Sequence, residues 1–184
     1  VPAQYTLQAE IEIMDRLGIS GSFLIDVLSP KRLQSRVFEL AGLPEKSIFD
    51  ERGKCMVLSA LIEEDKEQLT VYRGAAENAA NGFTERVSNI IASLKRSELT
   101  AEEVLMAAEK MGEGNTAAEK LKDIGRIYAA YEQRMAGELA DAEDISREMC
   151  MRFERSGVLK GQHIFVYGFD MITPTFAAQM LSMA

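Results

Sequence analysis

Residues 23–30 read Phe23-Leu24-Ile25-Asp26-Val27-Leu28-Ser29-Pro30. The first six residues are mostly apolar and bounded by turn-forming residues, which predicts a short buried β-strand. Ser29 and Pro30 are then the residue types preferred at the cap and the first position of a helix, and that helix is expected to end at Gly42. A buried strand followed at once by a helix is typical of an α/β domain.

A second strand and helix are predicted upstream of this pair. Residues 6–17 carry apolar side chains at helical spacing, namely Leu7, Ile11, Met14 and Leu17. Gly18 is expected to end that helix, and residues 1–4 are interpreted as the end of a strand. The opening of the chain therefore has the order strand, helix, strand, helix.

From about Asp50 the pattern becomes helical throughout. Apolar residues at helical spacing predict helices near residues 56–62, 83–94 and 141–153. Two further helices are predicted to begin with capping boxes, in which a Ser or Thr at the cap is followed three residues later by Glu or Gln. These capping boxes are Thr100 with Glu103 and Thr116 with Glu119.

An apolar strand pattern returns at residues 163–167, followed by a helix start at Thr173-Pro174. The predicted fold class is therefore α/β and mainly helical. The predicted domains are 1–45 as the first part of an α/β domain, 46–160 as a helical insertion, and 161–184 as the return to the α/β domain. A segment of about a hundred residues between strands of one sheet is a domain grown out of a loop.

The composition excludes several classes of protein. The 184 residues are 47% hydrophobic and 27% charged, which is typical of a folded domain. No apolar run approaches the roughly 20 residues needed to cross a bilayer. We therefore expect no membrane partner and a cytoplasmic location. The net charge of −8 argues against coating a DNA duplex, although one wall of a channel remains compatible with it.

Metal and disulfide chemistry is not expected in this chain. Cys55 and Cys150 are far apart and lack CxxC spacing, and both are interpreted as small apolar residues. His163 is the only histidine, so no ligand cluster forms around it. Because the chain starts Val1-Pro2 and stops inside a helical pattern, we interpret it as a fragment.

Five segments, in order along the chain, resemble the B subunit of AddAB-type (also RexAB-type) ATP-dependent helicase/deoxyribonucleases, which are similar to exodeoxyribonuclease V. The first and last are Val1-Pro2-Ala3-Gln4-Tyr5-Thr6-Leu7-Gln8-Ala9-Glu10 and Val166-Tyr167-Gly168-Phe169-Asp170-Met171-Ile172-Thr173-Pro174. Between them lie Asp26-Val27-Leu28-Ser29-Pro30-Lys31-Arg32-Leu33, Leu94-Lys95-Arg96-Ser97 and Leu139-Ala140-Asp141-Ala142-Glu143-Asp144. The resemblance covers essentially the whole chain.

The resemblance implies a partial RecA-like P-loop NTPase domain of superfamily 1, interrupted by a large all-α insertion. It also implies a parent protein that binds ATP and magnesium and carries an iron–sulfur cluster and a C-terminal nuclease domain. No cofactor is expected in this fragment, because two cysteines cannot hold a four-cysteine cluster.

The motor site is predicted to be degenerate. The phosphate loop GxxxxGK[ST] does not occur in the sequence, and by the resemblance it would lie upstream of Val1. Where active relatives end a strand with an acidic pair that holds magnesium, this chain has Tyr167 and Gly168. Asp170 lies beyond the strand and is interpreted as a turn carboxylate. No catalytic residue is therefore assigned, and the fragment is not expected to be active alone.

The resemblance also implies a single-stranded DNA groove and a role in recognising the recombination hotspot Chi. The candidate DNA-binding residues are Gln4, Thr6, Arg32, Phe169 and Ile172. Polar side chains at strand ends reach bases or phosphates, and Phe169 and Ile172 supply an apolar or stacking surface. The implied partners are single-stranded DNA and the helicase–nuclease A subunit, in a heterodimer that processes double-strand breaks for DNA repair and recombination. At two positions where an aromatic side chain would stack on a base, this chain has the smaller residues Pro30 and Ser35.

Other interpretations remain open at the level of sequence. Gln4 and Thr6 also fit a plain helix entry with Thr6 as the cap, and Arg32 a surface salt bridge. Lys95 and Arg96 are interpreted first as a solvated helix end that the helix dipole favours. For the chain as a whole, the alternatives are a fragment of an active superfamily 1 helicase and a helical protein-interaction module.

Overall fold

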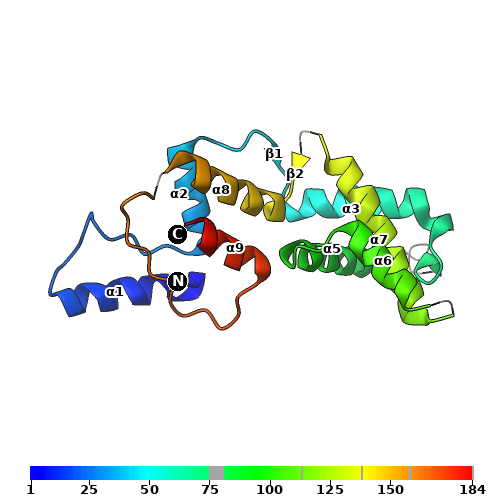
Figure 1. The fold of residues 1–184 in the computed structure, drawn as a ribbon, viewed down its shortest axis with the longest axis horizontal. Coiled ribbons are helices and arrows are strands. Elements are labelled where there is room, and N and C mark those ends of the chain that lie inside the picture. Colours follow the sequence, from blue (N-terminus) through cyan, green and yellow to red (C-terminus); the bar gives the residue numbers. More distant parts are fainter. Residues whose placement is uncertain (75–80, 113, 138, 158, 184) are drawn as a thin grey trace. The chain divides into compact units, whose positions relative to one another are not determined.

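The computed structural model describes residues 1–74, 81–112, 114–137, 139–157 and 159–183. The chain forms two compact units (Figure 1). The discontinuous unit comprises Val1–Pro44 and Ser146–Ala184, and the helical unit comprises Glu45–Ile145. None of the helices described is both long and apolar enough to cross a membrane.

The discontinuous unit contains the helices at both ends of the chain. They are the 3-10 helix η1 (Ala3–Tyr5), α1 (Thr6–Leu17), α2 (Pro30–Ala41), most of α8 (Ala142–Ser156) and α9 (Pro174–Ser182). The predicted end of α1 is confirmed, because Gly18 has a φ of 66°, its N–H donates to the Asp15 carbonyl, and the Ile19 N–H donates to the Met14 carbonyl. Its small core includes Val37 and Phe38 of α2 with Met149 and Phe153 of α8.

The strands predicted in the discontinuous unit are not formed. Residues 23–28 and 163–167 form neither a strand nor a helix, and residues 3–5 form η1 rather than the end of a strand. Within the described residues the strands are β1 (Ser47–Ile48) and β2 (Leu139–Ala140). Apolar composition supplies the propensity for a strand, but a strand also needs a neighbour to complete its hydrogen bonds. The described residues provide no such neighbour, so a RecA-like sheet does not appear among them.

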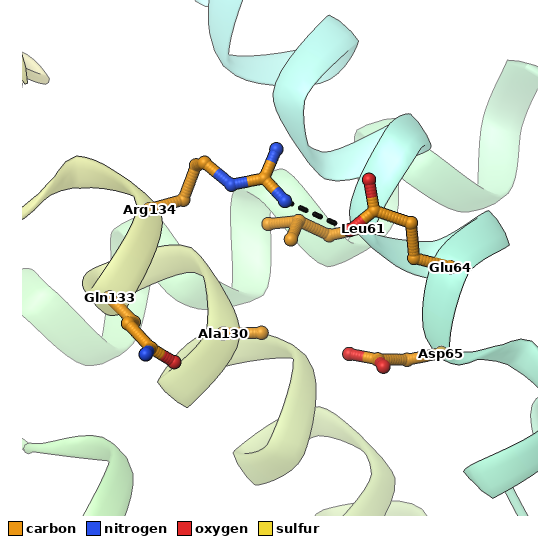
Figure 2. Close-up of a pocket in the computed structure, with 6 residues that line it drawn as sticks. All are labelled: Leu61, Glu64, Asp65, Ala130, Gln133 and Arg134. Carbon is orange, nitrogen blue, oxygen red and sulfur yellow. Dashed lines mark hydrogen bonds and ion pairs between the residues drawn. The ribbon is translucent and has the colours of Figure 1, made fainter.

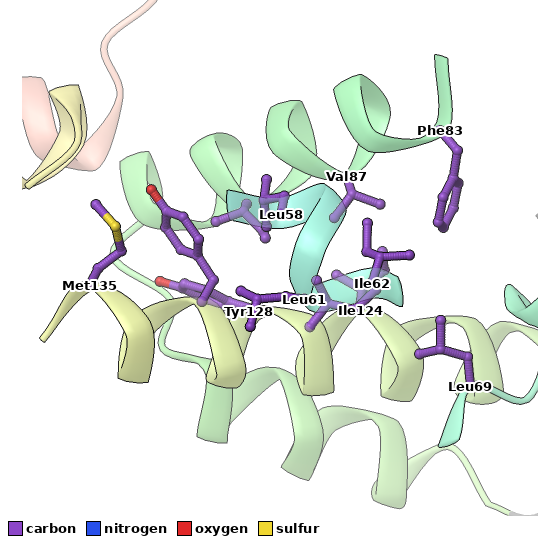
Figure 3. Packing of buried hydrophobic residues seen from close by; sticks show 12 residues of the cluster. Leu58, Leu61, Ile62, Leu69, Phe83, Val87, Ile124, Tyr128 and Met135 are labelled. Atoms are coloured by element: carbon purple, nitrogen blue, oxygen red, sulfur yellow. The ribbon is translucent and has the colours of Figure 1, made fainter. Parts of the chain in front are cut away.

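The helical unit surrounds one hydrophobic core. Its helices are α3 (Glu51–Asp65), the 3-10 helix η2 (Lys66–Gln68), α5 (Asn81–Arg96), α6 (Ala101–Lys110) and α7 (Thr116–Met135). Figure 3 shows how side chains of α3, α5 and α7 pack together in this core. Leu58, Ile91 and Tyr131 are fully buried at its centre. Each such side chain contributes about 1.5 to 3 kcal/mol by burial.

The helical unit begins and ends at the same place. β1 and β2 pair in parallel, with Ser47 opposite Leu139 and Ile48 opposite Ala140. The Phe49 N–H extends the pairing by donating to the Ala140 carbonyl at 2.9 Å. Adjacent ends are the geometry that an insertion in a loop requires. The compact unit ends at Ile145 rather than at the predicted boundary of 160, because α8 begins in this unit and continues into the other.

The predicted helix starts are confirmed with one exception. Thr100 and Glu103 form the capping box of α6, with N···O distances of 3.2 and 2.8 Å for the two backbone N–H groups. The predicted capping box of Thr116 with Glu119 is wrong. The cap of α7 is Asn115, whose side chain accepts from the Ala117 N–H at 2.9 Å. Asn is as good a cap as Thr, so the helix begins one residue earlier than predicted.

Candidate nucleic-acid interface

Three segments that are far apart in the sequence meet at Pro2. The Val1 amino group donates a hydrogen bond to the Leu28 carbonyl at 3.1 Å. On the other side, a Cβ placed on Gly168 would lie 3.4 Å from Pro2 Cδ, so Gly168 packs directly against the proline ring. We call Val1, Pro2, Leu28 and Gly168 the Pro2 junction. It brings together residues from three of the segments behind the family resemblance.

The backbone conformation of Gly168 makes this contact possible. Its φ of +81° lies in the left-handed region, which residues with a Cβ adopt only at a cost of about 1 to 2 kcal/mol. Gly168 therefore turns the chain after Tyr167 and before Phe169. Gly168 thus has a conformational role.

Gln4 and Thr6 lie next to the junction on η1 and the start of α1. The Gln4 side chain is exposed. The Thr6 hydroxyl donates to the Ala3 carbonyl at 3.0 Å, which leaves the lone pairs of its oxygen free to accept. Thr6 is not the cap of α1, because Tyr5 occupies that position without a side-chain hydrogen bond. The interpretation of Thr6 as a helix cap is therefore wrong.

Arg32 lies in the first turn of α2, four residues after Leu28 of the junction. The helix start predicted for Ser29-Pro30 is confirmed, since Ser29 Oγ accepts from the Arg32 N–H at 3.3 Å. The Arg32 side chain is exposed, and no carboxylate in the described part of the chain forms an ion pair with it. The surface salt bridge considered for Arg32 thus lacks a described partner.

Phe169 and Ile172 have different surroundings. The Phe169 ring packs on Phe176 of α9 with centroids 4.5 Å apart, so it positions that helix. The start of α9 at Thr173 is confirmed, with Thr173 Oγ1 accepting from the Phe176 N–H at 3.2 Å. Ile172 is 58% exposed. The junction brings together the segments that carry Gln4, Thr6, Arg32, Phe169 and Ile172, although no described contact links the Arg32 or Ile172 side chain to it.

The charge of the chain is divided unequally between the two units. The helical unit holds 21 acidic and 13 basic residues and therefore the entire net charge of −8. The discontinuous unit holds eight of each and is neutral. Phosphate binding requires local positive charge. The charge distribution thus makes the discontinuous unit less repulsive toward phosphates than the helical unit.

A groove in the helical unit illustrates the contrast. It lies between α3 and α7, has a volume of about 390 Å³, and is lined by Leu61, Glu64, Asp65, Ala130, Gln133 and Arg134 (Figure 2). Arg134 pairs with Glu64 at 2.8 Å. Glu64 and Asp65 supply two negative charges and Arg134 one positive charge, so the groove is acidic. An acidic groove is unsuited to a phosphate backbone.

The sequence interpretation of Lys95 is wrong. Lys95 lies in the last turn of α5 but is 2% exposed, and its ammonium contacts three carboxylates, those of Glu132, Asp141 and Asp144. Only its neighbour Arg96 has the predicted exposed position, where it pairs with Glu143 at 3.1 Å. The buried side chain of Asp123 is likewise not indicated by the sequence. No local pattern marks either residue, because their partners lie elsewhere in the chain.

The fold and the junction define a mainly helical α/β protein in which a helical unit interrupts a unit built from both ends of the chain. The chain belongs to the family described as "ADDB, N-terminal", whose model matches residues 1–181. The predicted family is thereby confirmed.

Individual relatives support the same assignment, and three of them share one name, that of the B subunit of an ATP-dependent helicase/deoxyribonuclease. The chain is 32% identical to the protein of Alkaliphilus metalliredigens over 175 residues, 33% to that of Caldanaerobacter subterraneus over 175, and 32% to that of Bacillus velezensis over 183. Each match covers 95% of this chain but 15% of the relative. The chain therefore spans about 15% of the length of these relatives.

Proposed function

We propose that the chain is the N-terminal region of a helicase–nuclease B subunit and that its discontinuous unit holds single-stranded DNA without hydrolysing ATP. The observation that carries the proposal is the Pro2 junction, which gathers Gln4, Thr6 and Arg32 onto adjacent segments. The relatives' names describe one subunit of a helicase/deoxyribonuclease. On this proposal the parent acts in the cytoplasm as a heterodimer with an A subunit, scanning for Chi during double-strand break processing.

Burial and charge support the choice of the discontinuous unit. Lys31 and Arg32 are both exposed at the start of α2, close in sequence to Leu28 of the junction. The acidic helical unit repels phosphates, which leaves the neutral unit as the more favourable place for a strand. The RecA-like assignment of the discontinuous unit belongs to this proposal.

The lack of hydrolysis is proposed from residues 167 and 168. The phenol of Tyr167 and the single hydrogen atom that is the side chain of Gly168 cannot hold magnesium as a pair of carboxylates does. Among the described residues no three His, Cys, Asp or Glu side chains are grouped to hold a metal ion. Magnesium-dependent ATPase activity of the full-length subunit without its partner would contradict this part of the proposal and favour an active helicase.

Arg32→Ala is expected to weaken the binding of a single-stranded oligonucleotide by the full-length subunit. Each phosphate contact contributes a slope of about −0.7 in the dependence of log K on log salt for single strands. Loss of one contact should therefore make the slope shallower by about that amount, whereas Arg32→Lys should preserve it. The measurement is fluorescence anisotropy across a salt series.

Arg16→Ala is the matched control for this prediction. Arg16 is exposed in the same unit, but it pairs with Glu12 on α1 at 2.8 Å. Its removal should leave both affinity and salt slope unchanged. Equal behaviour of the Arg32 and Arg16 variants would remove Arg32 from the interface.

A protein-interaction module is the second candidate function. The observation that favours it is the acidic helical unit, which exposes Met56, Met106 and Met111 on its surface. Flexible methionine side chains adapt to partner surfaces. Binding of the helical unit to a nuclease subunit, together with no affinity of the full-length subunit for single-stranded DNA, would favour this function.

A further inference from the structure

Exposed aromatic rings are confined to one unit of the chain. Among the described residues, the exposed ones are Tyr5, Phe23, Phe165 and Tyr167, and all four belong to the discontinuous unit. The described aromatic residues of the helical unit are buried or half-buried, namely Phe49, Tyr72, Phe83, Tyr128 and Tyr131. Large apolar groups exposed together on one part of a protein indicate a surface that binds something.

Two of these rings flank the Pro2 junction. The Tyr5 N–H donates to the Pro2 carbonyl at 3.0 Å, which fixes the backbone of Tyr5 beside the junction. Tyr167 directly precedes Gly168, which packs against the Pro2 ring. Tyr5 is 47% exposed and Tyr167 73% exposed. The junction therefore places two solvent-accessible phenol rings on adjacent segments, next to the polar candidates Gln4 and Thr6.

We propose that Tyr5 and Tyr167 are stacking residues for unpaired bases, an assignment that rests on the proposed function. Base stacking on aromatic rings is tolerant of sequence, because every base has a π-face. A tyrosine can also turn its hydroxyl to water while its ring covers a base. On this assignment Tyr167 occupies the position of an acidic motor residue but has a different role, which is to hold the strand.

Exposed cations on a segment that meets the junction favour single-stranded nucleic acid as the occupant. Lys31 and Arg32 follow Leu28 of the junction in the first turn of α2, and both are exposed. Rings for bases beside cations for phosphates are the combination that single-strand binding surfaces use. The alternative occupant is a protein partner that covers the two rings. Comparing an oligonucleotide that has bases with one that lacks them shows whether the rings bind bases.

The experiment compares two oligonucleotides of equal length, a fluorescein-labelled oligo(dT) and its abasic counterpart, binding to the full-length subunit. Tyr5→Ala and Tyr167→Ala should each weaken oligo(dT) binding about tenfold, because one stacked base is lost. Neither substitution should change binding of the abasic strand or the salt slope, since the phosphates remain. Tyr5→Phe and Tyr167→Phe should restore oligo(dT) binding because the ring is retained.

Met56→Ala is the control for removing an exposed apolar side chain, since Met56 is 74% exposed on the helical unit. It should leave both oligonucleotide affinities unchanged. Unchanged oligo(dT) binding by the double variant Tyr5→Ala/Tyr167→Ala, while Arg32→Ala still weakens it, would overturn the stacking assignment alone. An equal loss of affinity for oligo(dT) and for the abasic strand would also overturn the stacking assignment, because it would show that the substitutions act through the structure. No binding of oligo(dT) by the unmodified subunit would overturn the proposed function as well.

Discussion

Lys95→Met should lower the free energy of unfolding of the chain by about 3 to 5 kcal/mol, the range for breaking a buried ion pair by removing one partner. The Lys95 ammonium lies 2.7 Å from Asp144, 2.9 Å from Asp141 and 3.1 Å from Glu132. Lys95 is 2% exposed and Asp141 is 1% exposed. Methionine fills much of the same volume, so the loss reports the charge rather than a cavity.

The cost arises from the carboxylate that is left behind. Burial by itself raises the pKa of Asp141, but the charge and hydrogen bond of Lys95 outweigh burial and hold that pKa at about 2. The Tyr131 hydroxyl donates to the same carboxylate at 3.0 Å. Lys54 is 3.6 Å away, too far to replace the lost hydrogen bond. Without Lys95 a buried anion keeps only part of its compensation.

Urea denaturation of the chain measures this effect, with Arg96→Met as the control. Arg96 is the next residue, but its side chain is 48% exposed and pairs with Glu143 at the surface. Its loss should cost no more than about 1 kcal/mol. The double variant Lys95→Met/Asp141→Leu should recover part of the stability because no unpaired charge remains. Similar values for Lys95→Met and Arg96→Met would show that the network contributes little.

The same network determines how stability changes in acid. The pKa of Asp141 is lowered from its ordinary 3.8 to about 2, so the folded state binds its proton less readily than the unfolded state does. This stabilisation is complete above the ordinary value and is lost as the pH falls toward about 2. The acid dependence of the Lys95→Met variant should therefore be weaker between these two pH values than that of the unmodified chain.

Asp123→Ala should destabilise the chain by about 3 to 5 kcal/mol, since three backbone N–H groups in part-buried hydrogen bonds lose the carboxylate that they share. Asp123 is fully buried on α7. Its carboxylate accepts from the N–H groups of Thr70 at 2.9 Å, Val71 at 2.8 Å and Tyr72 at 3.0 Å. One side chain thereby holds the segment that follows η2 against α7.

Two variants and one local probe test this prediction. Asp123→Asn retains one acceptor oxygen and should lose less stability than Asp123→Ala. Asp65→Ala is the control, because the half-buried Asp65 carboxylate accepts from the neighbouring Gln68 side chain, at 3.3 Å, and its loss should cost less than about 1 kcal/mol. Amide hydrogen exchange at Thr70, Val71 and Tyr72 should accelerate in Asp123→Ala. Protection of these amides as in the unmodified chain would contradict the role assigned to Asp123.

Helix boundaries are the part of the fold that could be predicted well. Gly18 ends α1, Ser29 with Pro30 starts α2, and Thr100 with Glu103 starts α6, as expected. Each boundary depends on hydrogen bonds within about four residues, so the residues that fix it are adjacent in the sequence. The error at Thr116 arose because Asn115 competes with Thr for the same local role.

The candidate site was predicted less completely. The candidates Gln4, Thr6 and Arg32 came from the family resemblance, and their role in DNA binding stays a prediction. That they lie on adjacent segments follows from the Val1–Leu28 hydrogen bond and the packing of Pro2 on Gly168. No spacing in the sequence reports contacts between residues 2 and 168.

The amino-acid sequence is thus sufficient to predict the family, the helices and the apolar segments of this protein. Three-dimensional packing is required to show that Lys95 and Asp123 are buried and that residues 23–28 form no strand among the described residues. The physical reason is the range of the interactions. Caps and helical stripes are satisfied within one or two turns, whereas a buried ion pair or a β-ladder needs a partner from a distant part of the chain.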